Sequence, residues 1–343
     1  MKRPTERHVM HLLALSAVLT LPIEIARADV TLRERANGHF IAIPPVSPEE
    51  RLAPQATLGR ALLWDPRLSS SGDTACASCH LIEDHGSDRR TRCTTARGGR
   101  TGFHSMTVFN TQTAGAGLRW LADRQSGKVQ ALGSITGSMG FERRDDILPP
   151  LAEHGYRPQF SAAFPDADEP LTVDHYGQAL EVYQRTLRTP APFDAWLTGD
   201  DAAMTETQKS GLRRFMDMGC AGCHGGELLG GQSLQKFGLV ADYWEHTGSD
   251  EPHHGVMEKS GREADRDVFR VASLRNVAEM APYFHDASVA TLAQAVRVMA
   301  RVQLGRDPDD SATAEIVSFL MSLTGEIPVN FAPPDAFIVG QKP

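Results

Sequence analysis

The sequence lacks a second long hydrophobic run, a surplus of positive charge and a convincing series of alternating strands. Its one apolar run, residues 9–21, is too short for a good membrane-spanning helix, and no later segment provides one. The 343 residues contain 35 Lys and Arg against 43 Asp and Glu, a formal net charge of −8. This balance argues against a nucleic-acid partner, because proteins that bind nucleic acid carry a basic surface. It permits a basic protein partner.

The N-terminal segment has the three parts of an export signal. Lys2, Arg3 and Arg7 precede the apolar run, and "ARA" at 26–28 is a small-x-small cleavage site. We therefore expect residues 1–28 to be a signal peptide, and the mature chain to begin near Asp29. The mature protein is expected to be soluble and periplasmic, without membrane contact. An uncleaved anchor is the alternative.

Helical patterns predominate along the rest of the chain. Capping boxes, in which a Ser or Thr precedes a Glu or Gln by three residues, begin at Ser47, Thr205 and Thr291. Long connections rich in Gly and Pro fill 81–118 and 225–262, as expected of a chain that wraps a large cofactor. These signals predict an all-α fold, mainly helical with long loops. The predicted helices are 47–64, 172–187, 205–219, 291–304 and 311–323.

Length and an internal repeat indicate two domains. A helix followed by a CxxCH motif occurs twice, first with "CASCH" at 76–80 and then with "CAGCH" at 220–224. The segment 190–204 has the composition of a linker. We expect an N-terminal domain over 29–200 and a C-terminal domain over 201–343.

Two cysteines and a histidine at this spacing are typical of covalent haem attachment. The thiols add to the haem vinyl groups, and the adjacent histidine supplies an axial nitrogen to the iron. A zinc site made of four cysteines, or two small disulfides, would leave both histidines unexplained. The sequence therefore predicts two covalently bound haem c groups, haem 1 at Cys76, Cys79 and His80 and haem 2 at Cys220, Cys223 and His224. The fifth cysteine, Cys93, has no predicted partner and no assigned role.

The iron held by His224 needs a ligand on its other face, or that face is left open. Met299 lies on the apolar face of the predicted helix 291–304. A thioether opposite a histidine raises the reduction potential and closes the iron to substrates. By spacing alone, Met257, Met280 and Met321 are alternatives.

Longer stretches around these motifs carry a resemblance. They are "LGRALLWDPRLSSSGDTACASCH" (58–80), "GCAGCHGGELLGG" (219–231), "FRVASLRNVAEMAPYFHDASVATLAQAVRVMARVQLG" (269–305) and "IVSFLMSLTGEIP" (316–328). The chain resembles the bacterial di-haem cytochrome c peroxidases, which include related oxidases that mature methylamine dehydrogenase. In the peroxidases a Met occupies the position of Met299, whereas the methylamine-dehydrogenase-maturing relatives have Tyr there.

The resemblance implies two cytochrome c-like domains, each with one haem, facing each other across a gap. Haem 2 would take electrons from a small cytochrome c or cupredoxin, and haem 1 would reduce hydrogen peroxide to water. Members of the family are often homodimers. Trp120 matches a Trp that lies between the haems, and Gln130 matches a pocket Gln.

The haem 1 pocket departs from the family pattern. Ala96 stands where resting peroxidases have a removable distal His, and Gly140 stands at the acid/base Glu. The nearest carboxylate is Glu142, which is our candidate for the proton-transferring group, although its charged surroundings also suit a solvated turn. His104 falls near an Asn that binds calcium in the family, so it is a second pocket candidate. Since Met280 also replaces a calcium-site Thr, calcium is left open.

These observations favour an oxidoreductase of the cytochrome c peroxidase type. The departures at Ala96 and Gly140 keep two alternatives open. One is a di-haem oxidase that modifies an aromatic residue of a partner protein. The other is a non-catalytic electron carrier or redox sensor.

Overall fold

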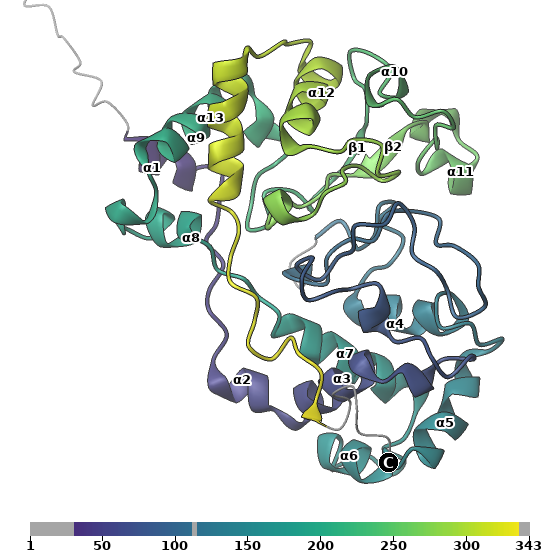
Figure 1. Ribbon diagram of the computed structural model, residues 1–343. Helices are drawn as coiled ribbons and strands as arrows, with labels where there is room; N and C mark the ends of the chain where they lie inside the picture. The colour runs from purple at the N-terminus through teal and green to yellow at the C-terminus, as the bar shows by residue number, and fades with distance from the viewer. Residues whose placement is uncertain (1–30, 112–114, 336–343) are drawn as a thin grey trace, which may run out of the picture. The chain divides into compact units, whose positions relative to one another are not determined.

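The computed structural model describes residues 31–111 and 115–335 (Figure 1). The predicted signal peptide, 1–28, lies outside the described residues. The described residues from Leu32 onward group into one compact unit. None of its described helices is long and apolar enough to cross a membrane.

The described chain is mainly helical, as predicted, with one two-stranded antiparallel sheet in which Gln235 faces Phe269. Its helices are α1 (Leu32–Asn37), α2 (Pro48–Leu52), α3 (Pro54–Trp64), α4 (Gly127–Thr136), α5 (Leu148–Glu153), α6 (Arg157–Ala163), α7 (Val173–Arg185), α8 (Pro192–Leu197), α9 (Glu206–Met218), α10 (Trp244–Thr247), α11 (Met257–Ser260), α12 (Leu292–Leu304) and α13 (Asp310–Met321). The strands are β1 (Leu234–Lys236) and β2 (Val268–Arg270).

The single helix predicted over 47–64 is wrong, because the structure has two helices, α2 and α3, in its place. Ala53 between them is extended, with φ −53° and ψ 138°. A proline clashes with a helical residue before it, so Pro54 ends α2 and occupies the first turn of α3. The Ser47–Glu50 capping box at the start of α2 is present as predicted.

The other four predicted helices are confirmed as α7, α9, α12 and α13, with ends within two residues of those expected. Side-chain caps account for their starts. Thr205 and Gln208 form the complete capping box of α9, and the Thr291 hydroxyl accepts a hydrogen bond from the Gln294 backbone at α12.

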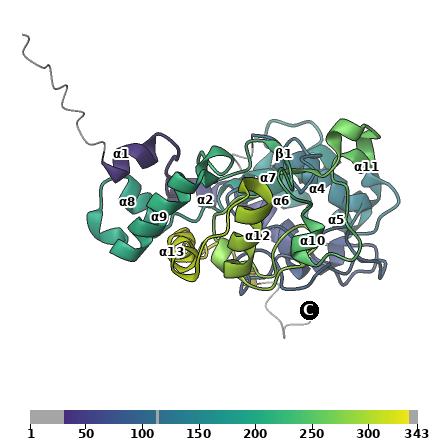
Figure 2. The ribbon, with the colours of Figure 1, turned by 90° about the horizontal axis from the view of Figure 1, so that it is seen from above.

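Buried apolar side chains form two clusters, which we call cluster A and cluster B. Cluster A contains side chains of α1, α8, α9, α12 and α13, and cluster B those of α3, α4, α5, α6 and α7. The pairs α9–α13 and α3–α7 pack most extensively, and Figures 1 and 2 show α9 beside α13. A glycine permits each close crossing. A Cβ on Gly211 would lie 1.9 Å from the Glu315 carbonyl oxygen, and one on Gly59 2.1 Å from that of Ala179.

The segment after α13 joins the two clusters. It leaves α13 in cluster A and runs toward α2 and α3 (Figure 1), and Phe331 is buried in cluster B. On the way, the Gly325 backbone N–H donates to Asn276 Oδ1 at 3.0 Å. Asn276 Nδ2 and Asn110 Nδ2 in turn donate to the Thr189 hydroxyl at 3.0 and 2.7 Å. Four distant segments are therefore held by one buried polar network.

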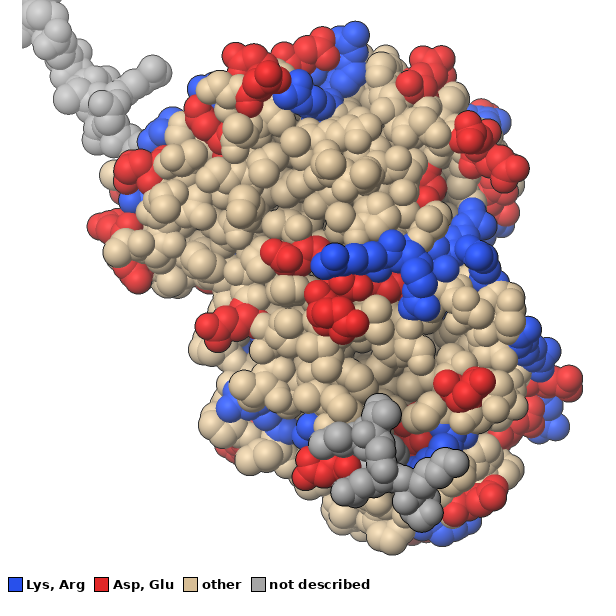
Figure 3. Space-filling view, viewed as in Figure 1, with Lys and Arg blue, Asp and Glu red and all other residues tan. Residues whose placement is uncertain are grey.

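The face shown in Figure 3 carries Asp and Glu interspersed with Lys and Arg. Many of these charges are paired. For example, Asp123 lies 3.3 Å from the Arg119 guanidinium and also contacts the Lys259 ammonium.

Candidate haem sites

The CAGCH motif follows directly from the end of α9. Gly219 ends that helix in the left-handed region, with φ 100°, and the turn Cys220–Gly222 begins immediately after it. The ring of His224 then makes a 3.0 Å hydrogen bond from Nδ1 to the Leu229 carbonyl. With the proton held on Nδ1, Nε2 keeps its lone pair for a metal. Burial lowers the pKa of His224, which favours this neutral form.

The CASCH motif repeats this arrangement in cluster B. Its turn spans Cys76–Ser78, and His80 Nδ1 lies 2.8 Å from the Gly86 carbonyl oxygen. Burial lowers the pKa of His80 as well. Both histidines are therefore oriented by the local backbone and kept neutral by burial, as an axial ligand requires.

A mostly apolar cavity of about 280 Å³ lies against the second motif. Cys220, Cys223, His224 and Met299 all line it. Two thiols, an imidazole with a free nitrogen and a thioether around one apolar cavity are a donor set that fits haem c. Of the alternative methionines, Met280 also lines the cavity.

Trp120 and His104 are brought together at the same cavity, which both side chains line. Trp120 Nε1 donates to the His104 carbonyl at 2.9 Å. The His104 side chain is only 5% exposed, and its Nδ1 lies 2.9 Å from the Arg90 carbonyl oxygen. Its buried Nε2 has no hydrogen-bond partner among the described residues. His104 thus presents a free ring nitrogen near Trp120.

Ala96 and Gly140, far apart in the sequence, are neighbours in the structure. A Cβ on Gly140 would lie 3.2 Å from the Cβ of Ala96, and Gly140 has φ 77°, which favours glycine. Glu142 lies apart from the buried groups, because its side chain is 84% exposed and its carboxylate is 3.9 Å from the Arg97 guanidinium. Gln130, on α4, donates to Ser134 at 3.3 Å and does not line the cavity of about 280 Å³.

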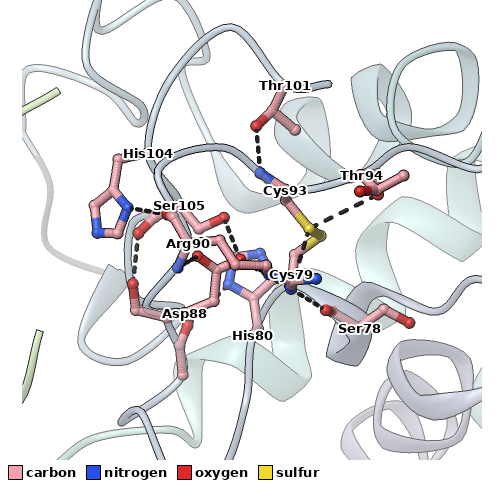
Figure 4. A network of polar contacts seen from close by, with 12 residues as sticks. Ser78, Cys79, His80, Asp88, Arg90, Cys93, Thr94, Thr101, His104 and Ser105 are labelled. Carbon is pink, nitrogen blue, oxygen red and sulfur yellow. Dashed lines mark hydrogen bonds and ion pairs between the residues drawn. A yellow bond between two sulfur atoms is a disulfide. The ribbon is translucent and has the colours of Figure 1, made fainter. Parts of the chain in front are cut away.

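The expectation that Cys93 has no partner is wrong, because it forms a disulfide with Cys79 (Figure 4). The loop after the motif folds back and brings the two Cα atoms to 5.9 Å. Arg90 supports this fold by donating to the Ser78 carbonyl at 2.6 Å and to Asp88 at 3.0 Å. One sulfur cannot hold both bonds, so a haem thioether at Cys79 requires reduction of this disulfide. The remaining cysteines are free thiols.

Comparison with known proteins provides independent evidence for haem binding. A family model described as di-haem cytochrome c peroxidase matches residues 53–202. Cytochrome c551 peroxidase of Pseudomonas aeruginosa is 38% identical over 327 residues, which cover 91% of this chain and 92% of that protein. Cytochrome c551 peroxidase of Nitrosomonas europaea is 34% identical over 316 residues, which cover 90% and 92%. The chain belongs to the di-haem cytochrome c peroxidase family.

This membership confirms the predicted family and the predicted class of enzyme, an oxidoreductase of the cytochrome c peroxidase type. The crystal structure of a MauG-like protein associated with microbial copper homeostasis has a similar fold. Its TM-score is 0.72 at 26% identity, and the match covers 85% of this chain and 97% of that one.

Sequence reasoning missed two buried polar residues of this di-haem peroxidase family member. Arg270 and His285 both line the cavity that holds His224 and Met299. The signal available was a basic residue inside each of two largely apolar stretches, "VFRVASL" and "PYFHDA". Such residues are rarely buried without a specific partner.

Proposed function

We propose that the chain is a di-haem c-type peroxidase of the periplasm, which reduces hydrogen peroxide to water with electrons from a small cytochrome c or cupredoxin. The observation that carries the proposal is the joint position of Cys220, Cys223, His224 and Met299 on one apolar cavity. Two peroxidases more than 30% identical over nine-tenths of the chain support it.

Each cluster with its CxxCH motif would form one cytochrome c-like domain, over 29–200 and 201–343. Cys76, Cys79 and His80 would hold haem 1, once Cys79 is released from Cys93. Cys220, Cys223 and His224 would hold haem 2. Helices α1 and α8, which precede position 201, pack in cluster A with the second domain.

Bound haem c supplies one-electron chemistry and, where an axial position is open, a binding site for peroxide. The residues around each site indicate which haem would carry electrons and which would bind peroxide. Met299 and His224 would hold the iron of haem 2, and the thioether would raise its reduction potential and leave no site for peroxide there. Trp120 is fixed by its bond to the His104 carbonyl and would assist electron transfer between the haems.

On the haem 1 side, Ala96 and Gly140 supply neither an axial ligand nor an acid/base group, so other residues would have to carry the proton. His104 is the first candidate for the proton carrier, because its Nδ1 is anchored and its buried Nε2 has no partner among the described residues; it lines the cavity next to Cys220, Cys223 and His224. Glu142 is the alternative carrier, and it would have to turn inward from the surface. Gln130 would complete the pocket. The same proposal includes a homodimer and leaves calcium open, to be tested by light scattering and metal analysis of the purified protein.

Oxidation of the reduced donor tests the function. The protein with two haems, mixed with hydrogen peroxide and a reduced small cytochrome c, should oxidise two cytochromes per peroxide consumed. Absence of turnover with both cytochrome and cupredoxin donors would reject the peroxidase in favour of a carrier or sensor.

A second function is favoured by Ala96 and Gly140 and by the MauG-like structural relative. In it the same haems oxidise an aromatic residue of a partner protein. Peroxide should then change the mass of a candidate partner only when this protein is present. An unchanged mass with rapid cytochrome oxidation would exclude it.

A further inference from the structure

Two arginines among the described residues are buried, and they differ in their partners. Arg275 is fully buried and pairs with the buried carboxylate of Asp194 at 2.7 Å. Arg270, at the end of β2, is 7% exposed, and no described carboxylate lies within 4.0 Å of its guanidinium. Burying a charge without a counter-charge costs desolvation free energy, so a bound anion would stabilise Arg270.

A backbone carbonyl fixes the guanidinium of Arg270, but not all of its N–H donors have an acceptor. Its Nε donates to the Arg119 carbonyl at 2.9 Å, and one Nη2 hydrogen points to the Met106 thioether at 3.3 Å. A thioether is a weak acceptor, and a guanidinium has five N–H donors. Three of the five therefore have no protein acceptor among the described residues. Burial, with no opposing charge, lowers the pKa of Arg270 to about 10.

The free donors belong to a side chain that lines the cavity shared by His224 and Met299. Arg270 is also tied to Trp120, because its backbone N–H donates to the Trp120 carbonyl at 2.7 Å. A planar guanidinium binds a carboxylate through two parallel hydrogen bonds. Haem carries two carboxylates, its propionates, on the edge opposite to the vinyl groups that react with cysteine.

We propose that Arg270 binds a propionate of haem 2, and that this ion pair raises the reduction potential of that haem. The inference rests on the proposed attachment of haem 2 at Cys220 and Cys223. Arg270 is in this account a positioning residue, since it acts through the propionate. A positive charge near the iron destabilises the ferric state relative to the ferrous state, which has one positive charge fewer.

The test compares Arg270→Gln with the wild type and with Arg262→Gln. Arg262 is exposed and pairs with Asp265 at 2.8 Å, so its variant loses the same charge at the surface. Potentials are measured by spectroelectrochemistry over a range of pH. We expect a lower haem 2 potential in Arg270→Gln at pH values where the propionate is ionised. We also expect a new dependence on pH, because the propionate without its arginine takes up a proton near neutrality and the potential rises as pH falls.

The inference would be overturned if Arg270→Gln contains two haems per chain and its haem 2 has the potential and pH dependence of the wild type. It would also be overturned if acetate or phosphate changes the wild-type potential and leaves that of Arg270→Gln unchanged, because Arg270 then binds a free anion. If Arg270→Gln does not fold, the ion pair is tested with Arg270→Lys instead. The resonance Raman propionate bands of haem 2 should shift in Arg270→Lys and stay unchanged in Arg262→Lys, and unshifted bands in both would reject the ion pair.

These outcomes are independent of peroxide turnover. A protein that shows the Arg270 effect and never consumes peroxide would reject the proposed function and retain the ion pair. A protein that consumes peroxide but lacks the Arg270 effect would retain the proposed function and reject the ion pair.

Discussion

Each motif histidine is oriented by a carbonyl only a few residues further along the chain. His80 bonds to Gly86 and His224 to Leu229, at 2.8 and 3.0 Å. Since the carbonyls come from the loops that follow the motifs, the turn and its loop act as one local unit. This explains how two sites in different clusters present the same nitrogen, Nε2, to a metal.

The disulfide between Cys79 and Cys93 gives the first prediction. The chain prepared without haem under oxidising conditions should have three cysteines that react with an alkylating agent in denaturant. Cys93→Ala should have four, because Cys79 is released. Mass spectrometry counts the labels. Five labels on the wild type would show that the disulfide does not form.

The sequence predicted the residues whose partners are close in the chain and missed those whose partners are distant. A CxxCH motif carries its three groups within five positions, so spacing alone indicated the chemistry. The partner of Cys93 and the buried state of Arg270 depend on how long loops fold back, and no local pattern encodes that. His104 was found only through the family resemblance, and its free Nε2 required the structure.

At the scale of elements, the helices were predictable because caps mark their ends. Thr205 with Gln208, and Gly219 at the other end, define α9 by hydrogen bonds among neighbours. The crossings between helices were not predictable. Gly211 and Gly59 look like weak points in a helical pattern, and only the packed structure shows that they admit another helix.

Gly211→Ala tests the α9–α13 crossing. The new methyl group would lie 1.9 Å from a backbone oxygen, so one helix must move. We expect the free energy of unfolding to fall by on the order of 3 kcal/mol, as in strongly overpacked cores. Gly102→Ala is the control, since a Cβ there meets nothing within 4 Å. Equal stability of the two variants in urea unfolding would refute the close crossing.

The loop that carries His285 gives a prediction about pH. Burial against Phe269, 4.3 Å between ring centroids, lowers the pKa of His285 to about 4, although Asp286 opposes the shift and His253 and Arg92 add to it. The neutral ring is favoured in the fold, so stability is retained above pH 6.5 and lost as pH falls toward 4. The loss attributable to His285 is up to about 3 kcal/mol.

His285→Phe should remove this part of the acid sensitivity. Urea unfolding at pH 7 and pH 4.5 should show a smaller difference in the variant than in the wild type. His154→Gln, at the turn after α5, should behave as the wild type does. An unchanged pH difference in His285→Phe would show that other groups govern acid unfolding.

At the scale of the whole molecule, the C-terminal segment links the two clusters. Phe331 is buried in cluster B, 4.7 Å from the Phe109 ring and 5.4 Å from the Trp64 ring. Phe331→Ala should reduce the free energy of unfolding by about 3–5 kcal/mol, since it leaves a cavity among aromatic rings. Val329→Ala is the control, because Val329 is 82% exposed. Matching denaturation curves would show that the segment contributes nothing to cluster B.

The central claim is that one haem is closed by Met299 and the other is open, and the EPR spectrum of the resting protein tests it most directly. We predict one low-spin and one high-spin ferric signal. Met299→Leu should convert the low-spin signal to high spin, whereas Met321→Leu, whose side chain is 57% exposed, should not. Two low-spin signals that Met299→Leu leaves unchanged would contradict the account.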